Sequence, residues 1–202
     1  MVRPRSVQAH SKVLEAAAEL FAASGIDATS MDAIADASGV SKATIYKHWP
    51  DKDSLALEVM GYLFGLDEEP VVFDSGDFRA DLIAQLRHEK APDCKALRER
   101  IMPHLIAYAS RNQVFGMAWR NRAIEPARVA LAALIKRGEK RGALKHGIDP
   151  EVGIALLLGP MIYGKFFLNQ KLGRKSPENL EVHTADAFLA AFGKPVKKKH
   201  TR

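Results

Sequence analysis

The sequence contains a single cysteine, Cys94, which excludes an internal disulfide and leaves no cysteine cluster for a metal. Its seven histidines are scattered and lack the spacing of metal ligands, so we expect no metal site. Motifs that hold nucleotides or catalytic zinc, such as G-x-G-x-x-G, the P-loop and H-E-x-x-H, are also missing. We therefore expect no cofactor, and the low cysteine content suits the reducing cytoplasm.

A long hydrophobic run is missing too. The most apolar window, residues 152–164, is interrupted by Gly159 and Pro160 and is followed by Lys165. Because a membrane span needs about 20 apolar residues, this window predicts a buried helix and no membrane partner. Residues 1–12 carry basic side chains without an apolar segment, so we expect no secretory signal.

Positive charge is in excess overall but scarce in the N-terminal third. The formal net charge is +6, yet residues 1–66 hold six Lys and Arg against eight Asp and Glu. Residues 194–202 hold five basic and no acidic side chains, and we expect them to form a basic mobile tail. Bulk charge is therefore a weak indicator of nucleic-acid binding here.

Catalytic constellations are absent as well. Residues 39–43 loosely match the G-x-S-x-G motif of a nucleophilic serine, but that motif follows a strand, and a helical pattern precedes it here. The carboxylates at 67–69 lie in the acidic, turn-rich segment 65–77, which we expect to be a linker. We expect no enzymatic activity, although an enzyme with an unrecognised site in the helical region stays an alternative.

Helical patterns occupy almost the whole chain. Val13, Ala17, Leu20 and Phe21 form one apolar stripe, and Gly25 is a natural C-terminal stop. Asp-Pro-Glu at 149–151 and Ser-Pro-Glu at 176–178 both have the pattern of a helix start, a cap followed by proline and an acid. They predict helices over 150–172 and 177–193. The expected fold class is all-α.

The segment 30–52 predicts a helix-turn-helix. Ser30 is placed to cap a helix that ends at Gly39, and Ser41 is placed to cap a second short helix that runs through Trp49. Pro50 stops that second helix, and Gly39 supplies the positive φ that a tight turn requires. Two short helices joined in this way are the helix-turn-helix unit.

A helical wheel on 41–49 separates an inner from an outer face. With about 100° per residue, Ile45 and Trp49 point inward, whereas Ala43, Thr44, Tyr46 and Lys47 point outward. A small residue permits close approach to base edges, Thr offers a methyl and a hydroxyl, and Tyr and Lys suit phosphate oxygens. The outer face therefore favours DNA contact over an ordinary solvated surface.

Residues 25–60 resemble the DNA-binding domain of the TetR family of transcriptional regulators. The matching features are AAAELFAASG (16–25), the Thr-Ser helix start (29–30), IA (34–35), SGVSKATIYKHW (38–49) and DKDSL (51–55). Trp49 stands where phenylalanine is usual, and Ala43 where glycine is frequent. The resemblance implies that DNA is contacted by Ser30, Lys42, Ala43, Thr44, Tyr46, Lys47, His48 and Lys52.

The same resemblance implies an N-terminal three-helix DNA-binding domain followed by a larger helical ligand-binding and dimerisation domain. We place the first in 1–52, with the motif at 30–49 and the next helix from about 51, and the second in 53–193. The implied partners are a double-stranded DNA operator, a second copy in a homodimer and a small-molecule effector. Tyr108, Phe115 and Trp119 are candidate effector contacts, although aromatic residues at helical spacing are more often core.

The favoured hypothesis is a dimeric, sequence-specific DNA-binding regulator of the TetR type, a repressor that a ligand releases from a pseudo-palindromic operator. The alternative is a helical small-molecule binding protein with a non-functional helix-turn-helix. The intact outer face of 42–47 argues against that alternative.

Overall fold

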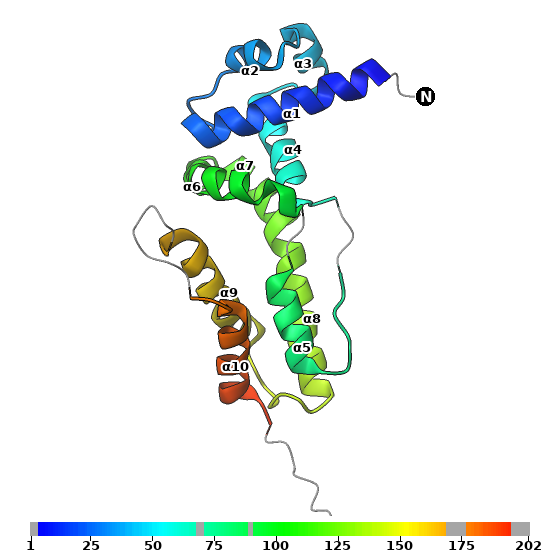
Figure 1. Cartoon of the computed structure of the whole chain (residues 1–202), viewed down its shortest axis with the longest axis vertical. Helices are drawn as coiled ribbons and strands as arrows, with labels where there is room; N and C mark the ends of the chain where they lie inside the picture. Colours follow the sequence, from blue (N-terminus) through cyan, green and yellow to red (C-terminus); the bar gives the residue numbers. More distant parts are fainter. Residues whose placement is uncertain (1–3, 68–70, 89–90, 169–176, 195–202) are drawn as a thin grey trace, which may run out of the picture. The chain divides into compact units, whose positions relative to one another are not determined.

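The computed structural model describes residues 4–67, 71–88, 91–168 and 177–194. These residues form helices and no β-strand, so the all-α prediction is confirmed; an isolated bridge pairs Leu144 with Gly193. In chain order the elements (Figure 1) are α1 (Pro4–Ser24), α2 (Met31–Ser38), α3 (Lys42–His48), α4 (Lys52–Phe64), α5 (Phe78–Arg87), the 3-10 turn η1 (Pro92–Cys94), α6 (Lys95–Arg111), α7 (Gln113–Trp119), the π-helical segment η2 (Arg120–Ile124), α8 (Glu125–Lys140), α9 (Pro150–Phe167) and α10 (Leu180–Phe192).

The chain folds into two compact units. Unit 1 is built from α1–α4 together with α6, α7 and η2, and unit 2 from α5, α8, α9 and α10. The chain passes between the two units after residues 69, 88 and 125, and the last of these is the first residue of α8. The predicted domains, residues 1–52 and 53–193, stay a prediction.

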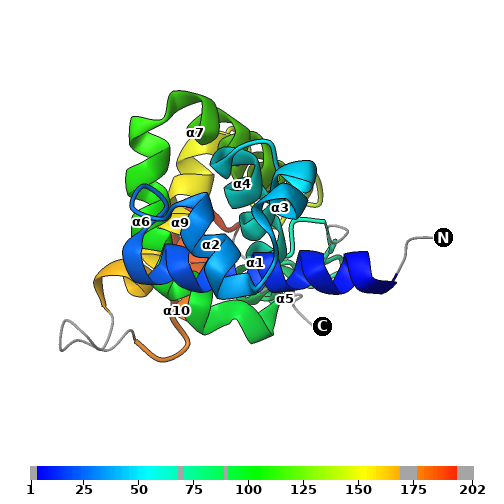
Figure 2. The ribbon, with the colours of Figure 1, turned by 90° about the horizontal axis from the view of Figure 1, so that it is seen from above.

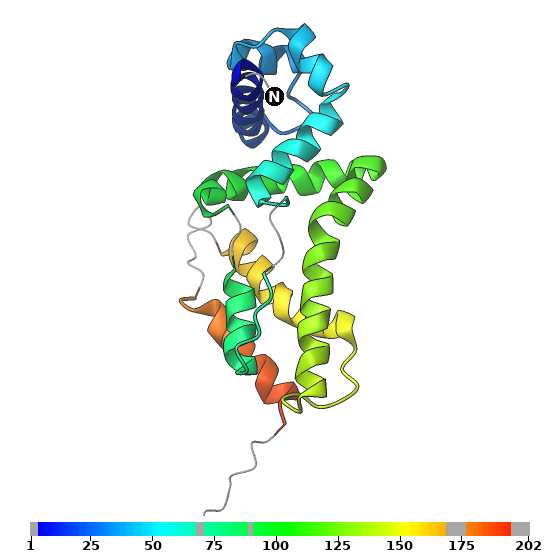
Figure 3. The ribbon, with the colours of Figure 1, turned by 90° about the vertical axis from the view of Figure 1, so that its right-hand side faces the viewer.

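The core of unit 1 forms around α1. The predicted stripe of α1 is buried at Val13, Ala17 and Phe21 and half-buried at Leu20. This face packs against α2, α4 and α6, and Figure 3 shows α1 end-on with the short helices along one side of it. The helix-turn-helix therefore has no separate core, because α6 and α7 contribute to the same apolar cluster.

The core of unit 2 forms where α10 packs against α5 and α9. Leu82, Leu157 and Phe188 meet there with apolar residues of α8. Gly153 permits a close approach of helices, since a Cβ at this position would lie 2.8 Å from Cδ1 of Ile135. Ion pairs join α5 to α10 beside this core. In one of them, Arg79 donates a hydrogen bond to Asp186 and so lowers the pKa of the Asp186 carboxyl.

Most helix ends agree with the sequence, and one differs. Gly25 and Gly39 end their helices with φ of +88° and +66°, as the sequence predicts. The helix predicted from residue 177 begins only at Leu180, because Asn179 adopts a left-handed φ of +53° that interrupts the helical path. Residues 169–172 of the predicted 150–172 helix and residues 195–202 of the predicted tail lie outside the described residues.

None of the helices in the described part of the chain is both long and apolar enough to span a bilayer. The apolar window at 152–164 lies within α9, where Gly153, Ile154, Leu157 and Gly164 are buried. The segment is helical as predicted, but it is buried on one face only, since Val152, Leu156 and Ile162 on the other face are about half exposed.

Replacing Ile45 by aspartate tests the inner face of α3. Ile45 is fully buried, so Ile45→Asp places an unpaired charge in an apolar core and should lower the free energy of unfolding by more than about 3 kcal/mol. Ala43→Asp, an exposed position on the same helix, is the matched control and should change stability by less than about 0.5 kcal/mol. Urea denaturation followed by circular dichroism measures both, and equal stabilities would contradict the assignment of the inner face.

Candidate nucleic-acid interface

Side-chain caps define the two helices of the motif. The Oγ of Ser30 accepts a hydrogen bond from the backbone N–H of Ala33 at 3.1 Å and begins α2. The Oγ of Ser41 accepts one from the N–H of Thr44 at 3.3 Å and begins α3. These caps satisfy backbone donors that the first turn of a helix leaves without partners. Both helix starts lie where the sequence predicts them.

The two faces of α3 differ in burial as the helical wheel predicts. Ile45 and Trp49 are buried, with 0% and 2% of their surface exposed, and Trp49 caps the C-terminus instead of continuing the helix. The side chain of Tyr46 stands out from the surface, with 48% of the residue exposed. Of the other predicted contact residues on this helix, Thr44 is half-buried and four are exposed, namely Lys42, Ala43, Lys47 and His48.

Lys42 is tied to the preceding helix. Its Nζ lies 2.6 Å from Oδ2 of Asp32 on α2, and this hydrogen bond raises the pKa of the lysine. Both side chains are exposed, so the pair is screened by solvent and contributes little to stability. Its effect is on the local charge, because Asp32 neutralises the ammonium of Lys42 at the start of α3.

Lys52 has internal partners that the sequence did not suggest. Its Nζ donates hydrogen bonds to the backbone carbonyls of Asp27 and Thr29, each at 3.0 Å. The amine therefore fastens the start of α4 to the loop between α1 and α2. The prediction that Lys52 binds DNA phosphate stays a prediction.

The start of α4 is closed by a capping box. Asp51 accepts from the backbone N–H of Ser54 at 2.7 Å, and the Oγ of Ser54 lies 3.4 Å from the N–H of Asp51. The backbone hydrogen bond from Ser54 lowers the pKa of the Asp51 carboxyl. This box holds the segment just beyond Pro50 and so fixes where α3 must end.

The aromatic residues predicted to contact an effector lie in the packed core of unit 1. Tyr108, Phe115 and Trp119 are each less than one tenth exposed, and Tyr108 and Phe115 meet edge to face with ring centroids 5.0 Å apart. The hydroxyl of Tyr108 donates to the carboxylate of Asp53 on α4, and burial raises the pKa of this tyrosine. Contact of these residues with an effector stays a prediction; the structure places them against the helix that follows the motif.

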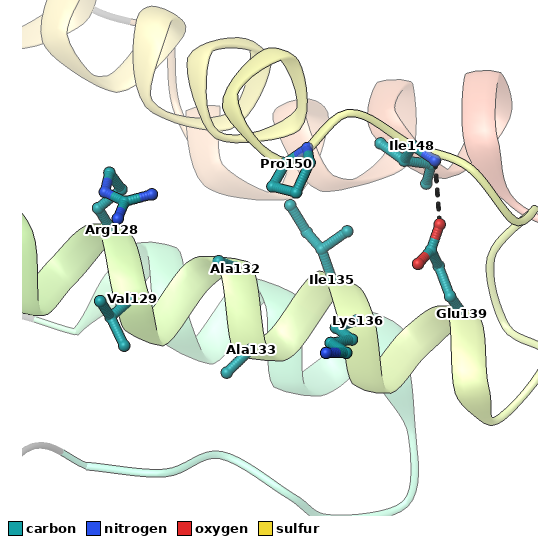
Figure 4. A pocket seen from close by; sticks show the side chains of 9 residues that line it. All are labelled: Arg128, Val129, Ala132, Ala133, Ile135, Lys136, Glu139, Ile148 and Pro150. Atoms are coloured by element: carbon teal, nitrogen blue, oxygen red, sulfur yellow. Dashed lines mark hydrogen bonds between the residues drawn. The ribbon is translucent and has the colours of Figure 1, made fainter.

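A shallow groove of about 500 Å³ lies in unit 2 between α8 and residues 148–150 (Figure 4). Its walls are mainly apolar, and its charged groups are engaged at two points. Glu139 accepts from the N–H of Ile148 at 3.0 Å, and Arg128 donates to Glu151 at 2.5 Å. Sequence reasoning did not single out this groove, because its sides come from segments without a common motif.

Sequence reasoning also missed two side chains that touch the end of α3. His10 of α1 and Glu58 of α4 both contact Trp49, the residue that stands where phenylalanine is usual in TetR-type motifs. The indole N–H was the signal that could have been followed, because a buried tryptophan needs an acceptor that phenylalanine does not.

Comparison with known proteins gives a consistent result over both regions. Residues 13–59 match the model of bacterial regulatory proteins of the tetR family, and residues 72–180 match a tetracyclin repressor-like C-terminal domain. The HTH-type transcriptional regulator YdeS of Bacillus subtilis is 30% identical over 161 residues, which are 80% of each chain. The DNA-binding transcriptional repressor TetR of Mycobacteroides abscessus is 30% identical over 69% of this chain and 73% of its own length. A TetR transcription regulator from Haloarcula marismortui shares the fold at a TM-score of 0.69 and 19% identity, over 92% of this chain and 98% of its own.

Replacing Lys52 by methionine tests whether its hydrogen bonds to the loop between α1 and α2 stabilise the fold. Lys52→Met removes two hydrogen bonds from a cation and should lower the free energy of unfolding by about 1–2 kcal/mol. Lys47→Met is the matched control on the exposed face of α3 and should change stability by less than about 0.5 kcal/mol. Thermal denaturation of both variants makes the measurement, and an unchanged Lys52→Met variant would contradict the role of this lysine in fastening the loop.

Proposed function

The chain belongs to the tetR family of bacterial transcriptional regulators, and we propose that it is a repressor that binds a pseudo-palindromic operator as a homodimer and leaves it when a small-molecule effector binds. Members of this family bind DNA operators and small-molecule effectors, act as dimers and are not enzymes. For this chain we infer that it has no catalytic activity and acts in the cytoplasm, where operator DNA is accessible.

The exposed face of α3 carries the proposal. Tyr46 and Lys47 offer a hydroxyl and an ammonium to phosphates, and Ala43 leaves room for a base edge beside them. On the opposite side of the helix, Ile45 and Trp49 are buried and hold α3 against the core of unit 1. Together with Ser30, Lys42, Thr44, His48 and Lys52, these residues are the proposed DNA contacts.

The charge of the N-terminal region supports specific rather than bulk attraction. Residues 1–66 have more acidic than basic side chains, and one of the few lysines, Lys42, is paired with Asp32. A protein that lacks a broad basic surface depends on a few well-placed contacts and on the sum over two subunits. We therefore infer recognition by the shape and chemistry of α3.

An apolar face on α9 supports association with a second copy. Beyond Glu151 in the first turn, the exposed residues from 152 to 164 recur at helical spacing and are apolar, small or aromatic: Val152, Ala155, Leu156, Gly159, Ile162 and Tyr163. A second copy with the same face gives a self-complementary contact of the kind that two-fold dimers use. Such a dimer supplies two recognition helices for two half-sites.

A helical small-molecule binding protein with a non-functional motif is the competing function. That function requires no particular chemistry on the outer face of α3, whereas Lys42, Ala43, Tyr46 and Lys47 are exposed there and suited to DNA. Selection from a random duplex library distinguishes the two functions, because the alternative predicts no enriched sequence. An enriched sequence with two-fold symmetry would support the dimeric repressor.

Replacing Tyr46 by alanine tests the recognition face. Tyr46→Ala should weaken binding to the selected duplex about tenfold or more, because it removes a contact worth about 1–3 kcal/mol at the DNA surface. Tyr62→Ala is the matched control, since Tyr62 of α4 is equally exposed, at 47% against 48%. Fluorescence anisotropy measures the affinities, and thermal melting checks that both variants stay folded. Equal affinities of the two variants would contradict the role of Tyr46.

Replacing Leu156 by arginine tests the apolar face of α9. Leu156→Arg puts a charge in the middle of the proposed self-contact and should shift the protein from dimer to monomer. Ile106→Arg on α6 is the control, because Ile106 is similarly exposed, at 53% against 49%, but lies outside the α9 face. Light scattering after size-exclusion chromatography measures the masses, and a dimeric Leu156→Arg variant would exclude this face as the dimer contact.

A further inference from the structure

One carboxylate joins the end of α3 to both α1 and α4. The Nε1–H of Trp49 donates to Oε2 of Glu58 at 2.5 Å, and the other oxygen of Glu58 lies 2.8 Å from Nε2 of His10. The His10 ring also lies against the indole, with centroids 4.8 Å apart. We call these three residues, His10, Trp49 and Glu58, the α3 clip.

The orientation of α3 depends on few contacts. The helix has seven residues, and helices this short are not stable by themselves. Its inner face is fixed by Ile45 in the middle and by Trp49 at the C-terminal end. The apolar ring of Trp49 packs without directional preference, whereas its hydrogen bond to Glu58 has a defined geometry. The clip is thus the directional part of the anchor.

We propose that Glu58 is a positioning residue for operator recognition, which holds α3 in its binding orientation through Trp49 and makes that orientation dependent on pH through His10. The proposal rests on the proposed function, because orientation is expressed as affinity for a specific duplex. When the clip is open, a smaller fraction of molecules presents α3 correctly, and the apparent affinity falls by that fraction.

The charge of His10 is the proposed source of the pH dependence. Histidine side chains change charge between about pH 5 and 8, and only the protonated ring forms an ion pair with Glu58. Within the described residues, the titratable side chains in contact with His10 are Glu58 of α4 and His48 of α3, whose ring centroid is 5.8 Å away. Protonated His48 would repel His10 and attract DNA, but these effects are also present when Glu58 is replaced by a neutral residue. Any part of the pH dependence of DNA affinity that is lost in Glu58→Gln is therefore due to the α3 clip.

Three variants test the positioning role on the duplex selected for the wild-type protein. Glu58→Ala opens the clip and should lower specific affinity about tenfold at pH 8, while affinity for unrelated duplex changes less than twofold. Glu58→Gln keeps an acceptor for the indole N–H and should restore most of the affinity at pH 8. Glu19→Ala is the control, because it removes a different carboxylate of unit 1, paired with Arg100 at 3.0 Å and remote from α3 in its contacts, and should change affinity less than twofold.

The pH profile separates positioning from general stability. Wild-type affinity should rise about threefold or more from pH 8 to pH 6, and Glu58→Gln should lose most of this rise, since its amide forms no ion pair with protonated His10. Binding by Glu58→Ala as tight as that of Glu19→Ala, or a full pH response in Glu58→Gln, would overturn the proposal. The Glu58→Gln comparison still decides the question if Glu58→Ala fails to fold.

The indole signal of Trp49 tests the clip without DNA. The chain has two tryptophans, so an ¹H–¹⁵N spectrum contains two indole peaks, and Trp49→Phe identifies the one from Trp49. This peak should shift between pH 8 and pH 6 in the wild-type protein and shift less in Glu58→Gln, where only the direct contacts of the histidine rings with the indole remain. Trp119 is the internal reference. A Trp49 peak that does not respond to pH refutes the link to His10. A wild-type protein that prefers no duplex but shows this titration would refute the proposed function and leave the clip standing.

Discussion

Burial of Ile45 and Trp49 is the constraint on which the motif depends. A seven-residue helix cannot hold itself together, so its stability comes from the two side chains that it sinks into the core of unit 1. The positions of the outer residues Ala43, Thr44, Tyr46 and Lys47 follow from this burial. Figure 2 looks down on this arrangement, with α2 and α3 close to α1. The buried side of α3 thus determines where its exposed side lies.

The same core extends beyond the helix-turn-helix. Tyr108 of α6 and Asp53 of α4 are hydrogen-bonded, and Asn112 adds a second bond to the Asp53 carboxylate at 2.8 Å. For Tyr108, contact with an effector stays a prediction. Its burial at the first turn of α4 gives it a structural task in unit 1. These two hydrogen bonds link the end of α6 to the helix that directly follows the motif.

The sequence predicted features that depend on neighbouring residues and missed those that depend on distant ones. Ser30, Gly39 and Ser41 act within one helical turn, so their caps and turn could be recognised from spacing alone. Lys52 binds carbonyls 23 and 25 residues away, and no local pattern indicates such a contact. The late start of α10 follows from a left-handed residue, Asn179, which a favourable Ser-Pro-Glu pattern concealed.

Charge is used sparingly and locally in this DNA-binding region. Lys42 pairs with Asp32, Arg111 pairs with Asp27, and His10 lies against Glu58, so three of the basic groups near the motif have acidic partners. Such exposed pairs add little stability, but they keep the surface close to neutral and so weaken attraction to arbitrary DNA. When the surface is close to neutral, the proposed recognition of DNA depends mainly on the orientation of α3. We infer that, in such a protein, a carboxylate that holds a tryptophan in place, as Glu58 does for Trp49, affects specificity more than an added lysine would.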